Sequence, residues 1–272
     1  MIRRAFSRWR QRQKGSSTRY TFPEVSNIPS IEDWVPLHPD LKLEISSCLH
    51  PELKAALNQG RPLSVVEEIA PSLFQFPMLS PSAVLRFNEE IKGLLDWSAQ
   101  TGVQLTPPNS MNNDGVILSD IGWETAFQEV MVKMIVPLAK ELFPTVGGAS
   151  LTTQHSFIVE YGKGRDRSLG FHVDDSEVTL NLCLGDSFEG SELYFQGRRC
   201  EAHRQLPHSP EEHVIVEHKV GVAILHAGAH RHGVLPIVSG RRRNLIMWCR
   251  STEERLVQEQ CAPWCGEHDS PY

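Results

Sequence analysis

Apolar residues follow two different periods along the chain, one in residues 82–142 and another from about residue 150 onward. In the first stretch they recur every three or four positions, which places them on one face of a helix. In the second, short apolar runs are separated by glycine-rich turns, which is typical of short β-strands. The pattern therefore predicts helices followed by a strand-rich half.

The helical half predicts two amphipathic helices. The first begins near Ser82, whose side chain can cap it, and runs to about residue 100. The second spans about 122–142, where Pro137 should kink it and Pro144 stops it. We expect both helices to pack on the outside of a sheet, so that their aromatic and methionine residues are core positions.

The segment before these helices, residues 21–75, has no sustained period and is interrupted by prolines. It contains one predicted short helix, with Pro51 in its first turn and Gly60 at its end. We find no candidate chemistry here and expect this segment to cover the outside of the core.

The strand-rich half predicts an antiparallel sandwich or barrel, a class that includes the jelly roll. The predicted strands span residues 156–161, 169–174, 178–184, 192–195, 214–216, 222–226 and 244–249. A turn signal at 112–115 (Asn-Asn-Asp-Gly) leads into a further strand between the two helices. The chain is thus predicted to be α+β, with packing helices on the N-terminal side of the β core.

Charge and composition limit the classes of partner. The 272 residues are 40% hydrophobic and 22% charged, an ordinary globular balance. No apolar run reaches the roughly 18–20 residues that a membrane-spanning helix needs. Seven of the 27 basic residues lie in the first 20 positions, which leaves 20 basic against 33 acidic residues in the rest of the chain. The net negative charge of residues 21–272 argues against nucleic-acid binding, which needs clustered basic residues.

The two ends of the chain leave alternatives open. The Arg-rich arm, residues 1–20, has the composition of an organelle-targeting segment or of a disordered basic tail. At the other end, Cys261, Cys265 and His268 make an incomplete set of four zinc ligands, so we expect residues 255–272 to be a loose tail. The six cysteines are scattered and follow no secretory signal, which favours reduced thiols in an intracellular, soluble protein, most simply cytoplasmic.

The first candidate for chemistry is a His-Val-Asp triplet that ends a predicted strand. On an extended strand, residues i and i+2 point to the same face, so His172 and Asp174 would project together. Two histidines and one carboxylate on one face of an octahedron are the ligand set of non-haem Fe(II) sites that react with oxygen. His226, His230 and His232 are all candidates for the third ligand, and strand parity does not choose among them.

The spacing after the third candidate matches a known family pattern. In the Fe(II)/2-oxoglutarate-dependent dioxygenases of the prolyl and lysyl hydroxylase type, the distal His is followed by Pro four residues later, Gly eight later and Arg or Lys about ten later. His232, Pro236, Gly240 and Arg242 fit these steps. The resemblance therefore selects His232 as the third ligand, with His230 as the fallback.

A closer resemblance, from about Phe76 to the tail, is to the 2-oxoglutarate and iron-dependent oxygenase domain-containing protein 2 family. Ser191 differs from the second Gly of many members. The matching motifs are Asn109-Ser-Met-Asn-Asn-Asp-Gly-Val, Tyr161 with its following glycines, Glu177-Val-Thr-Leu-Asn-Leu, Leu193-Tyr-Phe-x-Gly, Val216-Glu-His-x-Val-Gly and Arg242-x-Asn-Leu-Ile-Met-Trp.

This resemblance implies a double-stranded β-helix (jelly-roll) oxygenase domain over 149–254, preceded by supporting helices over 76–148. It implies Fe(II), O2 and 2-oxoglutarate, which is converted to succinate and CO2 as a substrate is hydroxylated, and use of L-ascorbate (vitamin C). It implies that His172, Asp174 and His232 bind the metal. It also implies that Arg242 binds the far carboxylate of 2-oxoglutarate and that Tyr161 gives the cosubstrate a hydroxyl contact.

Several roles stay open at this stage. Thr179, Asn181 and Cys183 share parity on one strand and either line the pocket or are ordinary barrel interior. Asp175 and Glu177 are either groups that orient the metal-binding histidines or solvated loop acids. For the substrate we expect a protein side chain of the Pro or Lys type. A non-catalytic binding protein and a nucleic-acid demethylase with the same iron chemistry are the alternatives.

Overall fold

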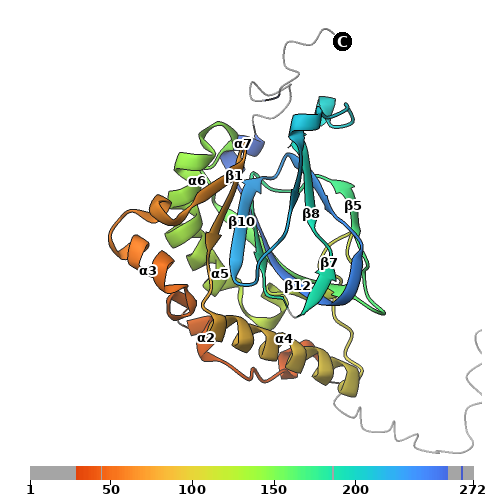
Figure 1. Cartoon of the computed structure of the whole chain (residues 1–272). Helices are drawn as coiled ribbons and strands as arrows, with labels where there is room; N and C mark the ends of the chain where they lie inside the picture. Colours follow the sequence, from red (N-terminus) through yellow and green to blue (C-terminus); the bar gives the residue numbers. More distant parts are fainter. Residues whose placement is uncertain (1–28, 44, 186, 257–264, 266–272) are drawn as a thin grey trace, which may run out of the picture.

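The computed structural model describes residues 29–43, 45–185, 187–256 and 265, which form a β core covered on one side by helices (Figure 1). The basic arm, Cys261 and His268 lie outside the described residues. No helix in the described part of the chain is long and apolar enough to cross a membrane.

Among the described residues, the strands form an eight-stranded and a four-stranded sheet. The strands are β1 (Glu67–Ala70), β2 (Leu73–Pro77), β3 (Gly115–Ile117), β4 (Thr153–Gly162), β5 (Leu169–His172), β6 (Val178–Cys183), β7 (Phe188–Gly190), β8 (Leu193–Arg198), β9 (His213–Val216), β10 (Val222–Ala227), β11 (His230–Val234) and β12 (Ile237–Arg250). The larger sheet has the order β1-β2-β10-β6-β12-β4-β3, with β7 paired to β12, and the smaller has the order β5-β11-β8-β9. All of these pairs are antiparallel, and side chains of both sheets share one inner hydrophobic cluster. The predicted α+β jelly roll is therefore confirmed.

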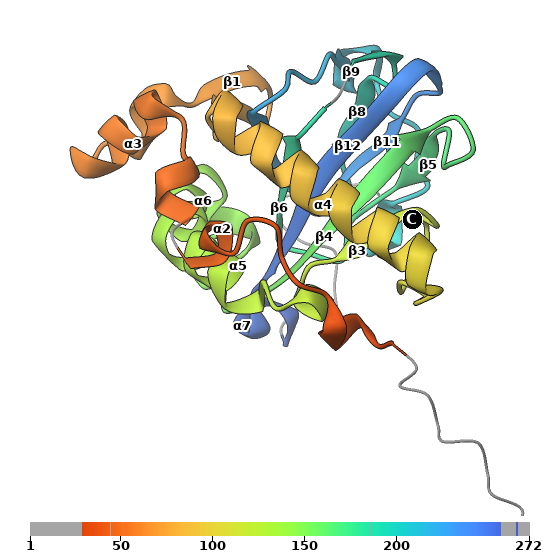
Figure 2. The ribbon, with the colours of Figure 1, turned by 90° about the horizontal axis from the view of Figure 1, so that it is seen from below.

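Helices cover the outer face of the larger sheet. They are α2 (Asp40–Leu43), α3 (Pro51–Asn58), α4 (Pro81–Thr101), α5 (Glu124–Val130) and α6 (Val136–Leu142), and a short α7 (Thr252–Arg255) follows β12. Figure 2 shows α4 lying across the sheet, and Asn88 of this helix donates a hydrogen bond to the carbonyl of Leu184 at 2.8 Å. The helices therefore close one face of the larger sheet and leave its other face to the inside of the jelly roll.

Both faces of the larger sheet are buried, and side chains alternate between them. On β12, Leu245 and Met247 join the core under the helices, whereas Ile246 and Trp248 join the inner cluster between the sheets. This two-residue period decides which polar side chains can reach the inside of the jelly roll.

Residues 67–77 contribute a hairpin that the sequence analysis missed. Strand β2 pairs with β10 along its whole length, and Leu73 is fully buried in the inner cluster. The segment before the helices therefore supplies part of the sheet, in addition to the expected covering helix at Pro51–Asn58. The strands are short and separated by two residues, so they give little periodic signal.

Both predicted long helices exist, with corrected details. The cap of α4 is Ser80, not Ser82, because the side chain of Ser80 accepts a hydrogen bond from the Ala83 amide and Pro81 occupies the first turn. The second helix is interrupted by a π-helical segment, Met131–Ile135, just before Pro137. A wider turn of this kind accommodates a proline, which has no N–H to donate.

Candidate active site

The three predicted metal ligands meet at one end of the space between the sheets. His172 ends β5 and is the direct register partner of His232 on β11. The Nε2 atoms of these histidines lie 3.5 Å from Oδ1 and 3.7 Å from Oδ2 of Asp174, respectively. One ligand atom from each residue lies within 4.8 Å of the other two. Asp174 lies two residues beyond the end of β5, so the predicted strand over 169–174 is shorter than expected.

Backbone carbonyls hold both imidazoles in the tautomer that suits a metal. Nδ1 of His172 donates to the carbonyl of Gly170, and Nδ1 of His232 donates to the carbonyl of His230, each at 2.8 Å. Because the proton is on Nδ1, each Nε2 presents its lone pair toward Asp174. Burial lowers the pKa of His232 to about 3, which keeps that ring neutral.

Asp174 is positioned by the loop that follows it and by Gly228. Its amide donates to the Gly228 carbonyl at 3.0 Å, and its Oδ2 accepts from the Thr179 hydroxyl at 2.7 Å. Gly228 in turn donates its amide to the Glu177 carbonyl at 3.0 Å. A Cβ atom on Gly228 would lie 1.8 Å from the carbonyl oxygen of Ser176, so only glycine allows this close approach.

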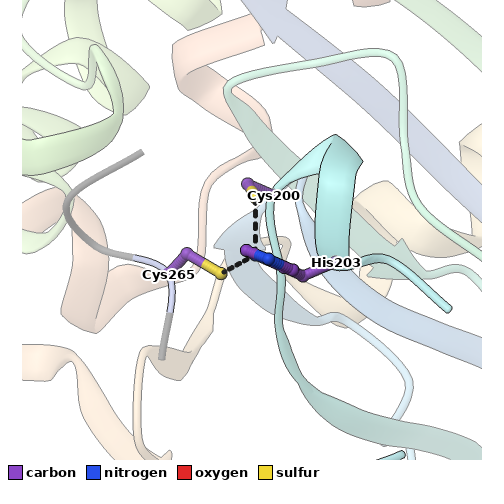
Figure 3. A group of neighbouring side chains, drawn as sticks. All are labelled: Cys200, His203 and Cys265. Atoms are coloured by element: carbon purple, nitrogen blue, oxygen red, sulfur yellow. Dashed lines mark hydrogen bonds between the residues drawn. The ribbon is translucent and has the colours of Figure 1, made fainter. Parts of the chain in front are cut away.

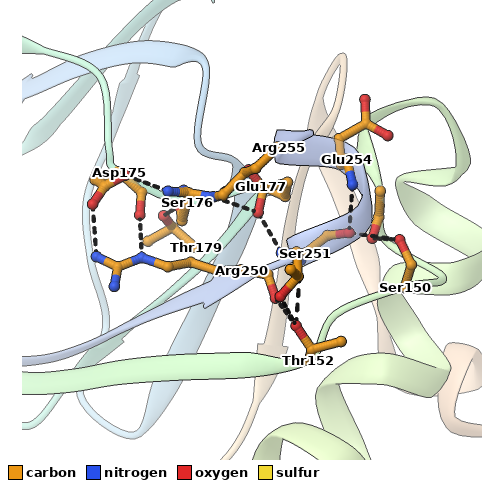
Figure 4. A network of polar contacts seen from close by, with 12 residues as sticks. Ser150, Thr152, Asp175, Ser176, Glu177, Thr179, Arg250, Ser251, Glu254 and Arg255 are labelled. Carbon is orange, nitrogen blue, oxygen red and sulfur yellow. Dashed lines mark hydrogen bonds and ion pairs between the residues drawn. The ribbon is translucent and has the colours of Figure 1, made fainter. Parts of the chain in front are cut away.

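A polar network ties the same loop to the end of β12 and to α7 (Figure 4). Asp175 accepts from Arg250 and from Arg255, each at 2.7 Å. The buried carboxylate of Glu177 accepts from the Ser251 amide at 2.5 Å and from Arg255 at 3.0 Å. Asp175 is an exposed loop acid, as one interpretation predicted, and it pairs with Arg250 and Arg255. Glu177 is buried in an ion pair with Arg255, so that interpretation is wrong for Glu177. Backbone carbonyls, and not these two acids, accept from the histidines.

The other two candidate histidines, His226 and His230, lie at different distances from the metal-ligand cluster. His226, on β10, is fully buried, and its Nε2 lies 3.8 Å from Oδ2 of Asp174. The ring of His230 instead packs against Phe195, with centroids 5.0 Å apart, and His230 is not part of the cluster of possible ligands. His226 is therefore the neighbour of the His172/Asp174/His232 set, and the fallback residue His230 is not.

Arg242 lies on β12 inside the jelly roll and is fully buried. Its Nε donates to Oδ1 of Asn244 at 2.8 Å, and its Nη1 donates to the Ser191 hydroxyl at 3.2 Å and to the Ser191 carbonyl. Its Nη2 donates to Nδ1 of His218 at 3.2 Å. These partners are all neutral, and in the described part of the chain no carboxylate forms an ion pair with Arg242.

His218 is a site residue whose role the sequence analysis did not identify. Its Nε2 donates to the Val222 carbonyl at 3.0 Å, so its Nδ1 is an acceptor, shared by Arg242 at 3.2 Å and by the Asn244 amide at 3.1 Å. Burial, together with the charge of Arg242, lowers the pKa of His218 to about 3 and keeps the ring neutral. The only signal was its place in the motif Val216-Glu-His-x-Val-Gly, which carries no chemistry by itself.

Tyr161 lies on β4 as the direct register partner of Arg242. Burial raises the pKa of Tyr161 to about 12, so its hydroxyl keeps its proton near neutral pH. The Asn112 amide donates to this hydroxyl at 3.4 Å, and Asn112 and Asn113 are themselves held by Asp166. The loop motif around residue 112 therefore orients Tyr161.

One cavity joins the metal-ligand cluster to Arg242. Thr179 and Asn181 line it, as one interpretation predicted, while Cys183 lies beyond them and beside Arg242. Its apolar walls are Met111, Phe157, Val159, Leu169, Leu193, Val234, Ile246 and Trp248. A wider, open groove adjoins it and shares Asn109, Met111 and Trp248 with it, so the cavity opens to the surface there.

An antiparallel jelly roll with two histidines and a carboxylate at one end of its cavity defines the class of non-haem iron oxygenase folds. A family model, the OGFOD2-like domain, matches residues 31–148, so the likeness begins well before Phe76. The protein named 2-oxoglutarate and iron-dependent oxygenase domain-containing protein 2 of Xenopus tropicalis is 32% identical over 266 residues, covering 94% of this chain and 71% of its own length. The chain belongs to that family.

Plant relatives match at higher identity over a smaller share of their length. The 2-oxoglutarate and iron-dependent oxygenase domain-containing proteins CP2 and ICU11 of Arabidopsis thaliana are 40% and 44% identical over 86% and 75% of this chain. The chain spans 61% and 52% of their lengths. Among solved structures, a Trichoplax adhaerens prolyl hydroxylase in complex with a hypoxia inducible factor peptide is 13% identical, with a TM-score of 0.47 over 80% of this chain and 94% of that one.

Proposed function

We propose that the protein is an Fe(II)- and 2-oxoglutarate-dependent dioxygenase that hydroxylates a protein side chain. The observation that carries this proposal is a fully buried arginine without a carboxylate partner among the described residues, in the same cavity as a His/Asp/His cluster. An unpaired buried cation is costly, and an anionic ligand in the cavity would compensate it.

The donor set fits Fe(II). His172, Asp174 and His232 would hold the ion through two neutral nitrogens and one carboxylate oxygen, which leaves positions open for a chelating keto acid and oxygen. When bound, the iron and 2-oxoglutarate supply the oxidising chemistry, with succinate and CO2 as coproducts.

The protein's own groups bind and orient the cosubstrate. An arginine has five N–H donors, and Nε, Nη1 and one Nη2 proton of Arg242 are engaged by Asn244, Ser191 and His218. Cys183 is a further neighbour of the guanidinium. The positive charge of Arg242 and the hydroxyl proton of Tyr161 would bind the far carboxylate of 2-oxoglutarate. The apolar walls of the cavity exclude water from this contact, which strengthens it.

The open groove supports a protein substrate. It is bordered by Asn109, His155, Trp248 and Arg250 and adjoins the cavity on the side of Val173, close to the metal cluster. Such a groove can accept an extended segment whose side chain enters the cavity. A mouse relative named procollagen-lysine,2-oxoglutarate 5-dioxygenase 2 is 28% identical over 66% of this chain and agrees with a protein side chain as the target. The acidic body disfavours nucleic acid, and an intracellular, cytoplasmic location remains our expectation from the cysteines.

The test is succinate formation by the purified chain with Fe(II), 2-oxoglutarate, ascorbate and air, with and without a cell lysate as substrate. His232→Ala should lose bound iron and activity, whereas His230→Ala, the matched control, should keep both. Mass spectrometry of the lysate should find one added oxygen on a protein target only with the parent enzyme. Equal iron binding in the parent and His232→Ala, or no succinate under any condition, would contradict the proposal.

A further inference from the structure

A second cluster of metal-ligand side chains lies outside the candidate active site (Figure 3). The sulfur atoms of Cys200 and Cys265 lie 3.3 Å and 3.5 Å from Nδ1 of His203, and the three atoms lie within 4.8 Å of one another. Both cysteines are buried, and His203 is partly buried. The cluster joins the loop after β8 to the C-terminal segment, two parts of the chain that are far apart in sequence.

The distances match those around a tetrahedral zinc ion. With Zn–S near 2.3 Å and Zn–N near 2.0–2.1 Å, a tetrahedral site places sulfur and nitrogen about 3.5 Å apart. Two sulfur atoms converge on a single imidazole nitrogen, which has either one proton or one lone pair. A metal ion placed between the three atoms could bind all of them at once.

The local backbone also suits a metal ligand pair. Cys200 directly precedes the short 3-10 turn Glu201–His203, and the His203 amide donates to the Cys200 carbonyl at 3.1 Å. This Cys-x-x-His turn brings both side chains to one side of the loop (Figure 3). Within the tail alone, Cys261, Cys265 and His268 are an incomplete set of zinc ligands, which predicted a loose tail. Cys265 is instead buried beside Cys200 and His203.

We propose that Cys200, His203 and Cys265 bind a structural zinc ion that is separate from the candidate iron site. The fourth position of the ion is not assigned, because Cys261 and His268 lie outside the described residues. The ion would fasten the C-terminal segment to the loop between β8 and β9.

The zinc site would support the strand that presents His232. The buried guanidinium of Arg231 on β11 donates to carbonyls of the loop that carries Cys200, at Leu206 (2.5 Å) and Arg204 (3.4 Å). It also donates to the Gly197 carbonyl on β8 at 3.3 Å. Arg231 directly precedes His232 in the chain. Fixing this loop would therefore restrain β11 from the outside of the smaller sheet.

The first test is zinc stoichiometry, measured in a background that cannot load zinc at the candidate iron site. The double variant His172→Ala/Asp174→Ala of the full chain, expressed with added zinc, should retain about one zinc per chain after desalting. Adding Cys200→Ser or Cys265→Ser should reduce zinc to near zero. Adding Cys48→Ser, a buried cysteine under the helices, should leave it unchanged. No zinc in the background variant, or full zinc after both cysteine substitutions, would overturn the proposal.

A second measurement covers the case in which a cysteine variant fails to fold. In the zinc-loaded parent chain, Cys200 and Cys265 should resist alkylation, and a chelator should expose both while circular dichroism stays native-like. Cobalt loading of the background variant should give a thiolate-to-cobalt charge-transfer band. Alkylation rates of Cys200 and Cys265 that do not respond to the chelator would contradict the site.

Discussion

Arg242 and Arg243 are adjacent on β12 and almost equally buried, yet only Arg243 has a carboxylate partner among the described residues. Arg243 faces the helices, where its Nε donates to Oε1 of Glu160 at 2.7 Å and its Nη1 donates to Oδ1 of Asn88 at 2.5 Å. Arg242 faces the cavity, where its partners are neutral. Adjacent residues of the same type thus serve as a structural ion pair and as a candidate anion site.

Substituting these two arginines should have opposite effects on the stability of the ligand-free protein. Arg243→Met leaves Glu160 buried, with only Arg165 at 3.1 Å to compensate it, and should lower the free energy of unfolding by about 3 kcal/mol. Arg242→Met removes an unpaired buried charge and should leave stability equal or higher, while 2-oxoglutarate no longer raises the melting temperature. Urea unfolding with and without 2-oxoglutarate measures both effects. An equal loss of stability in the two variants would refute the distinction, and exposed Arg241→Met is the control.

His218 should act on 2-oxoglutarate binding through Arg242. His218→Ala removes the acceptor for the Arg242 Nη2 proton, and we expect the KM for 2-oxoglutarate to rise about 10-fold, the value of one hydrogen bond to a charged group, with kcat changed little. His218→Asn keeps an acceptor near the Nδ1 position and should recover part of the affinity. Initial rates against 2-oxoglutarate concentration would separate the two parameters. A fall in kcat alone, or no rescue by Asn, would argue against a positioning role.

The same histidine should contribute to acid sensitivity. In the native state its pKa is lowered to about 3, whereas in the unfolded chain it is near 6.5. Between these values the unfolded state binds more protons, so stability should fall as the pH falls from about 6.5 toward 3. At pH 5 the protonation of this histidine in the unfolded chain should lower the free energy of unfolding by about 2 kcal/mol. Urea unfolding of metal-free protein at pH 7.5 and pH 5 should therefore show a smaller acid-induced loss in His218→Asn than in the parent, and identical losses would exclude this contribution.

Gly228 should be essential for metal affinity. In Gly228→Ala the new methyl group would meet the Ser176 carbonyl, displace the loop at 174–177 and weaken Fe(II) binding at least 10-fold. Gly170→Ala is the matched control, since its carbonyl orients His172 but a Cβ there meets no atom within 4 Å. Titration with Mn(II) or Co(II) would measure affinity. Equal metal binding by the two variants would show that the loop is not held by this contact.

The jelly roll and the candidate ligand residues could be predicted from the sequence, whereas one of the strands that carry those residues could not. Strand β11 was missed because His230-Arg231-His232-Gly233-Val234 looks polar, although every residue of it is buried. Its buried Arg231 is paired with residues distant in sequence, because the guanidinium donates to carbonyls of the loop after β8. A hydrophobic pattern cannot report such contacts, whereas the spacing from His232 to Arg242 could be counted along the chain.

Contacts between residues that are distant in sequence could not be predicted either. His218 and Arg242 are 24 residues apart, and Cys200 and Cys265 come from different segments, so no local motif joins them. Asp174 was placed correctly beside His172 although the strand argument behind that prediction was only half right, because β5 ends at His172. Asp174 is instead positioned by the hydrogen bond from its amide to the Gly228 carbonyl, two residues beyond the end of the strand.

The pairing of His172 with His232 has a consequence for local unfolding. Strand β5 is the edge of the smaller sheet and is joined there to β11 alone, so its backbone amides should exchange with solvent early when the cavity is empty. A metal held by both histidines and Asp174 would cross-link this edge strand to its neighbour. Slower hydrogen exchange confined to residues 169–174 would then be a direct gauge of metal occupancy, independent of any substrate.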